Sequence, residues 1–167
     1  MSYFISQYLV YEEFETRIKN LNGSESVIKA IKGMRAAFFE LELAEAAFSD
    51  AESVLMIDQD IFLQILFLEF RAKLAIALGR IGEGQLLIAQ IKGLLQPDMP
   101  HEYQIIPITC EISLLIKEGN FKLAENLIEE CLQVLSLESD RYLYLILDYG
   151  FLLAIECRMK KIKDTIE

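Results

Sequence analysis

The feature that most constrains the fold of this chain is a helical hairpin within residues 112–135, with its turn at Gly119-Asn120. An apolar helical pattern ends at Glu118, and a second one begins directly after the turn. Residues of the second pattern recur at three- or four-residue steps, which is the spacing of one helix face: Phe121, Ala124, Ile128, Cys131 and Leu135. Glycine suits the left-handed end of a helix, so we expect two antiparallel helices here.

The remaining chain reads as further helices, and no segment has the alternation and turn residues of a strand pair. We expect a single all-α domain, residues 1–167, of about seven helices. Whether residues 25–56 form one helix or two is open, because no glycine or proline occurs from Met34 to Asp58. The expected units are a helix at 3–22, a degenerate hairpin at 25–56, hairpins at 58–97 and 105–138, and a C-terminal helix at 139–163.

The turn of the 58–97 hairpin is predicted at Gly82-Glu83-Gly84, followed by a return helix that stops before Pro97. Pro107 fits the first turn of the helix at 105–118, where its missing N–H costs nothing. Gly82 and Gly119 are 37 residues apart, and each lies between two apolar helical patterns. A helical hairpin that recurs at this distance is typical of an α-solenoid.

Residues 105–138 resemble the tetratricopeptide repeat family. Gly119 stands at the turn, Phe121 at the aromatic position and Ala124 at the small position. The 68–101 segment is a weaker match, with Gly84 where the aromatic residue belongs and Leu87 where alanine belongs. The resemblance implies a short solenoid of stacked antiparallel hairpins. A helical bundle that mimics one is the alternative.

The resemblance also implies a partner-binding groove formed by the first helix of each hairpin. Its positions map here onto mostly apolar or small residues: Glu69, Ala72, Ile76, Thr109, Ser113, Leu143 and Leu147. Such a groove would bind a peptide or the apolar face of an amphipathic helix. We therefore expect a protein–protein interaction module that acts as an adaptor or chaperone.

Charge and hydropathy narrow the partners. The net charge is −10, and no lysine or arginine lies between Arg35 and Arg71. This shortage of positive charge excludes nucleic acid as a partner. It favours a basic protein partner, whose binding at residues 36–70 we expect to be sensitive to salt. Mean hydropathy is +0.30, and charged residues interrupt the greasiest segments, 61–70 and 142–155, before either reaches the length of a membrane span. With no signal peptide at the N-terminus, a cytoplasmic protein is expected.

Residues for catalysis or metal binding are scarce. The single histidine, His101, lies beside Pro100 in an expected loop, without a cysteine or carboxylate cluster at metal-ligand spacing. The three cysteines lie in apolar helical patterns and are expected to be reduced thiols, with Cys157 the most accessible. Asp148 lies in an apolar helical pattern, and we expect it to have a structural role. We expect no enzymatic activity, no metal and no cofactor.

Three other functions fit the same features. A small acidic protein with an apolar groove is similar in size, charge and architecture to the tetratricopeptide-type chaperones of bacterial type III secretion. Its apolar faces could instead be buried in a homodimer or larger assembly, as in a structural subunit. A sensor that binds a small ligand or signalling peptide is the third alternative.

Overall fold

The structure is a computed structural model. It describes residues 61–135 without interruption, together with residues 46, 139, 141–142, 145–146, 149–150, 152–155 and 157. The expected helix at 3–22, the segment 25–56 (except for position 46) and Asp148 lie outside the described residues. Within the described part, the chain is all helical, which confirms the all-α prediction there.

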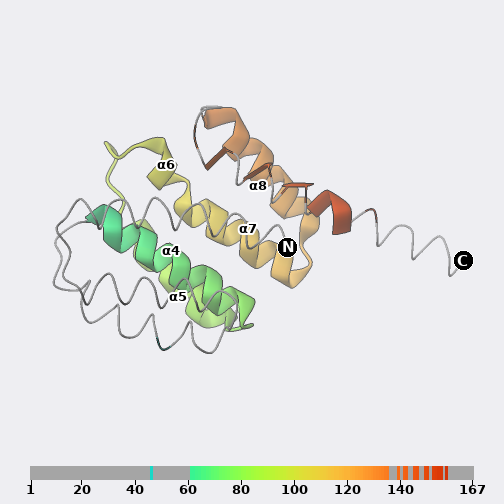
Figure 1. Ribbon diagram of the computed structural model, residues 1–167, viewed down its shortest axis with the longest axis horizontal. Helices are drawn as coiled ribbons and strands as arrows, with labels where there is room; N and C mark the ends of the chain where they lie inside the picture. The colour runs from blue at the N-terminus through green and yellow to red at the C-terminus, as the bar shows by residue number, and fades with distance from the viewer. Residues whose placement is uncertain are drawn as a thin grey trace, which may run out of the picture.

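Five helices form residues 61–134 (Figure 1), compared with about seven predicted for the whole chain. They are α4 (Ile61–Ala77), α5 (Ile81–Leu94), α6 (His101–Gln104), α7 (Ile106–Glu118) and α8 (Phe121–Val134). The residues described between 141 and 157 are also helical, and the backbone N–H of Arg141 donates to Ser139 Oγ at 3.3 Å. Ser139 thus caps the start of the C-terminal helix.

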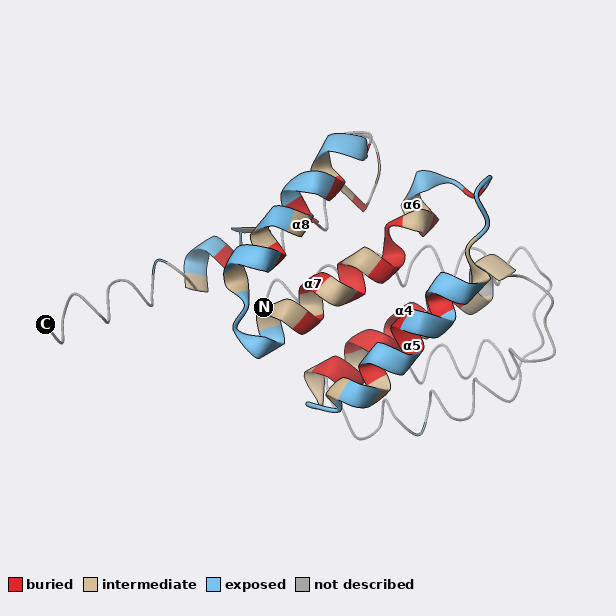
Figure 2. Cartoon of the chain, turned by 180° about the vertical axis from the view of Figure 1, so that it is seen from behind, coloured by how far each residue is buried: buried red, intermediate tan, exposed pale blue. Residues whose placement is uncertain are grey.

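Helix α7 is shared by two apolar cores, and it lies between the α4–α5 pair and α8 (Figures 1 and 2). Ile106, Cys110 and Leu114 face the core formed with α4 and α5. Ile112 faces the second core, formed with α8 and with Leu145 and Leu152 of the C-terminal helix. Burial on two sides explains why α7 is apolar around most of its circumference.

The turns of the two hairpins are equivalent at a distance of 40 residues. Gly79 and Gly119 both have φ of 79°, the left-handed conformation that ends a helix without steric cost in glycine. The N–H of Gly79 donates to Ile76 O at 3.0 Å, and the N–H of Gly119 donates to Ile116 O at 3.2 Å. The predicted turn at Gly119 is confirmed.

The predicted turn at Gly82-Glu83-Gly84 is wrong, because these residues form the first turn of α5. Gly84 is instead the point of closest approach between α4 and α5. A Cβ atom built on it would lie 2.7 Å from Ile76 Cγ1, so only glycine fits without a shift. Gly84 lies 40 residues before Ala124, and Ile81 lies 40 residues before Phe121, which is the same distance as that between the two turns.

The connection between the hairpins contains a short helix where the sequence predicted a loop. In α6, Tyr103 is buried and its ring meets Phe62 edge-to-face at 4.8 Å between centroids. Gln104 donates its side-chain amide to Met99 O at 2.8 Å. Pro107 occupies the first turn of α7, as predicted.

Candidate functional site

A hollow of about 390 Å³ lies between α5, α7 and α8. This volume is at the lower end of the roughly 300–1,000 Å³ found for small binding pockets. Its lining combines five apolar side chains with three polar ones: Ile88, Ala89, Leu114, Leu115, Leu127, Gln85, Lys92 and Glu111. A mostly apolar surface with a few polar groups suits another apolar side chain better than a charged one.

Helix periodicity places these residues together. Gln85, Ala89 and Lys92 follow one another at four- and three-residue steps, so they form one wall along α5. Leu127 of α8 forms part of the opposite wall. Leu86 and Leu123 lie one helical turn from Ala89 and Leu127, with 68% and 56% of their surface exposed.

An ion pair joins two helices at the hollow. Lys92 Nζ lies 2.6 Å from Glu111 Oε1, which connects α5 to α7. The two side chains are 53% and 34% exposed, so the surrounding water weakens their attraction. The pair neutralises the two charges that line the hollow, and it leaves the rest of the lining apolar or uncharged.

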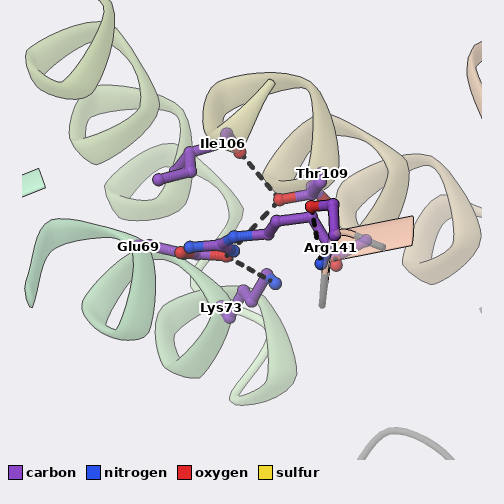
Figure 3. A network of polar contacts seen from close by, with 7 residues as sticks. Glu69, Lys73, Ile106, Thr109 and Arg141 are labelled. Carbon is purple, nitrogen blue, oxygen red and sulfur yellow. Dashed lines mark hydrogen bonds and ion pairs between the residues drawn. The ribbon is translucent and has the colours of Figure 1, made fainter. Parts of the chain in front are cut away.

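A second unusual feature is a buried group of four polar side chains, called here the Glu69 cluster: Glu69, Lys73, Thr109 and Arg141 (Figure 3). Glu69 Oε1 accepts hydrogen bonds from Arg141 Nη1 at 2.6 Å and from Lys73 Nζ at 2.9 Å. The Thr109 hydroxyl lies 3.5 Å from the same oxygen and donates to Ile106 O at 2.8 Å. One carboxylate oxygen thus connects α4, α7 and the C-terminal helix.

Electrostatics keep Glu69 ionised. Burial by itself raises the pKa of a carboxyl group, but the positive charges of Arg141 and Lys73 and their hydrogen bonds outweigh it. Together they lower the pKa of Glu69 from 4.5 to about 2. The other carboxylate oxygen, Oε2, has no hydrogen-bond partner among the described residues.

The thiol beside this cluster is poorly suited to chemistry. Burial, with smaller effects from nearby charges, raises the pKa of Cys110 to about 12, and the thiol therefore stays protonated near neutral pH. Cys131 is buried as well, and Cys157 is exposed, in agreement with the predicted accessibilities. In the part of the chain that the structure describes, no three His, Cys, Asp or Glu side chains are placed to hold a metal ion.

The predicted groove residues divide into three groups. Glu69, Ala72, Ile76 and Thr109 are buried, with at most 4% of their surface exposed, so a partner cannot reach them in this structure. Ser113 is half-buried and donates its hydroxyl to Thr109 O at 3.1 Å. Leu143 and Leu147 lie outside the described residues. The structure brings Glu69 and Thr109 together, but as members of a buried cluster.

The sequence did not predict the hollow, and it did not predict that Glu69 and Thr109 belong to a buried polar cluster. The hollow needs the relative placement of three helices, and its leucines have the same pattern as core residues. Arg141 is 72 residues from Glu69, so no local motif links them. The signal in the sequence was the group of charged residues within the apolar pattern of α4, which comprises Glu69, Arg71 and Lys73.

Comparisons with protein-family models, with curated proteins and with solved structures gave no match. The resemblance to tetratricopeptide repeats thus stays a prediction. No helix within the described residues has both the length and the apolar composition needed to cross a membrane.

Proposed function

We propose that this protein is a non-catalytic protein–protein interaction module, an adaptor or chaperone of the cytoplasm. In this proposal, the hollow between α5, α7 and α8 receives apolar side chains from a helix or peptide of the partner. The binding surface is thus formed by α5 and α8, the second helices of the two hairpins, together with α7, whereas the sequence predicted it on the first helices alone.

One observation carries the proposal: the large apolar side chains with the greatest exposure in the described chain lie on α5 and α8, the helices on either side of the hollow, one or two helical turns from residues that line it. They are Leu86 of α5 and Leu123 and Val134 of α8, at 68%, 56% and 58% exposure. Single exposed leucines are common on protein surfaces and need no explanation. An apolar hollow with exposed apolar side chains on both walls is the arrangement typical of a recognition surface.

The proposal includes a short solenoid related to tetratricopeptide repeats. Two observations support it, namely the matching turns at Gly79 and Gly119 and the matching small residues Gly84 and Ala124. In addition, Lys117 Nζ donates to Ala77 O at 3.0 Å, a contact between positions that are 40 residues apart. Repeat units that contact their neighbours at equivalent positions are characteristic of solenoids.

The test uses a designed helical peptide of about 16 residues with leucines at positions i, i+4 and i+7, and a second peptide with alanines at those positions. Binding is measured by fluorescence anisotropy. The variant Ala89→Glu places a charge in the hollow, and Gln90→Glu is the matched control on the same helix, since Gln90 is exposed and is not among the residues that line the hollow.

We expect the leucine peptide to bind the wild type and Gln90→Glu equally, and to bind Ala89→Glu at least about tenfold more weakly, because the new carboxylate loses its water when the hollow is filled. The alanine peptide should not bind. Equal binding of both peptides, or no effect of Ala89→Glu, would exclude the hollow as the binding surface.

A further inference from the structure

The outer face of α8 carries one carboxylate within an apolar stripe. Leu123, Leu127, Glu130 and Val134 follow one another at steps of four, three and four residues, so they lie on one helix face. Leu127 lines the hollow, and the other three side chains are exposed. Whatever covers this face must therefore contact Glu130 as well as the leucines.

Glu130 differs from the other carboxylates of α8. Glu125 pairs with Lys122 at 2.6 Å, and Glu129 accepts a hydrogen bond from the Tyr149 hydroxyl at 3.3 Å. Glu130 has neither an ion pair nor a side-chain hydrogen bond with any described residue. In the free protein water solvates it, but a covering partner would remove part of that water, which is unfavourable unless the partner supplies a positive charge.

The same residue argues against a second copy of this chain as the occupant. In a parallel pairing of two α8 helices, Glu130 of one copy would lie opposite Glu130 of the other, and like charges repel. In an antiparallel pairing, the 4-3-4 spacing places Glu130 opposite Leu127, which leaves a carboxylate against an apolar side chain. A partner with a basic residue at this position avoids both the repulsion between like charges and the burial of an unpaired carboxylate.

We propose that the partner is an amphipathic helix that lies along α8, inserts apolar side chains into the hollow and places a lysine or arginine opposite Glu130. This inference rests on the proposed function and specifies the chemistry of its partner. Apolar residues on the partner give binding, and the basic residue sets the register and excludes acidic helices. The net charge of −10 on the whole chain favours the same partner during encounter.

The experiment uses the leucine peptide in two forms that differ only at the position predicted to face Glu130, which is lysine in one and glutamate in the other. Each is titrated against the wild type, Glu130→Lys and Asp98→Lys by fluorescence anisotropy at low and at high salt. Asp98→Lys makes the same change in net charge in an exposed turn before α6, so it is the matched control.

We expect the wild type and Asp98→Lys to bind the lysine peptide about five- to tenfold more tightly than the glutamate peptide at low salt. Glu130→Lys should reverse that preference, and high salt should reduce both differences. If both peptides bind all three proteins with equal affinity, the basic partner is excluded while the apolar hollow stands. If neither peptide binds, the proposed function fails as well.

Discussion

At the scale of single residues, Glu69 connects three helices. One of its carboxylate oxygens contacts Lys73 of α4, Thr109 of α7 and Arg141 of the C-terminal helix. Replacement by glutamine removes the negative charge and leaves Arg141 and Lys73 buried beside a neutral amide. Removal of one partner from a buried charge cluster typically costs about 3–5 kcal/mol. We expect Glu69→Gln to lower the free energy of unfolding by an amount near this range, as measured by urea denaturation.

The control for this variant is Glu83→Gln. Glu83 is 39% exposed and lies 3.6 Å from Arg71 and 3.7 Å from Arg80, so its pairs are solvated. This substitution should change the free energy of unfolding by less than about 1 kcal/mol. Equal effects of the two substitutions would mean that the Glu69 cluster contributes no more than a surface pair.

The pKa of Glu69 gives a separate prediction about pH. Since folding lowers this pKa from 4.5 to about 2, the ionised carboxylate stabilises the fold fully above about pH 4.5. The contribution decreases as the pH falls from 4.5 toward 2. The difference in unfolding free energy between wild type and Glu69→Gln should thus be constant above pH 4.5 and shrink below it. A difference that stays constant down to pH 2, in urea titrations across this range, contradicts the assigned pKa.

At the scale of helices, Gly84 fixes the distance between α4 and α5. In Gly84→Ala, the new Cβ would approach Ile76 Cγ1 to 2.7 Å, and Ile76 is only 2% exposed, so it has little room to move. Such overpacking typically costs about 1–3 kcal/mol. Thermal unfolding should thus show a lower Tm for Gly84→Ala than for the wild type.

Gly82→Ala is the matched control for Gly84→Ala, two positions earlier on the same helix. A Cβ at Gly82 would meet no atom within 4 Å, and alanine favours a helix over glycine by up to about 1 kcal/mol. We expect this variant to be as stable as the wild type or slightly more so. A destabilised Gly82→Ala would instead favour the turn that the sequence predicted at 82–84.

The comparison of these two glycines explains how far the sequence could predict the helices. Apolar periodicity placed α7 and α8 correctly, and it indicated α4 and α5, because an amphipathic pattern is local information. It misplaced the α4–α5 turn, because a glycine that ends a helix and a glycine at a helix crossing are alike in sequence. Gly79 was the correct choice, and only its φ and its hydrogen bonds distinguish it.

The candidate site was less predictable than the helices, because it depends on contacts between residues that are far apart in the sequence. The hollow depends on how α5, α7 and α8 are spaced, and its leucines were indistinguishable from core residues. The repeat positions of Glu69 and Thr109 predict a groove, yet both side chains are buried, and Thr109 Oγ1 lies 3.5 Å from Glu69 Oε1. Contacts between residues 40 and 72 positions apart leave no periodic signal.

At the scale of the whole molecule, Arg141 is the residue that connects the start of the C-terminal helix to α4. Its Nη1 lies 2.6 Å from Glu69 Oε1, and the two side chains are 4% and 1% exposed. Elsewhere the described residues of the C-terminal helix contact the chain through apolar residues, including Leu145 and Leu152, and through the partly exposed hydroxyl of Tyr149, which donates to Glu129. Apolar contacts tolerate small shifts, whereas a buried ion pair requires one geometry. The ion pair therefore fixes the position of this helix relative to α4.

Arg141→Met tests this role by amide hydrogen exchange. We expect the amides of residues 152–155 to exchange at least about tenfold faster relative to those of α5, since local opening of the C-terminal helix becomes easier while α5 keeps its packing on α4. Lys92→Met is the control, because it removes an exposed ion pair of the same N···O distance, 2.6 Å, and should leave both segments unchanged. If residues 152–155 and α5 accelerate by the same factor in Arg141→Met, the cluster stabilises the whole domain and does not hold this helix in particular.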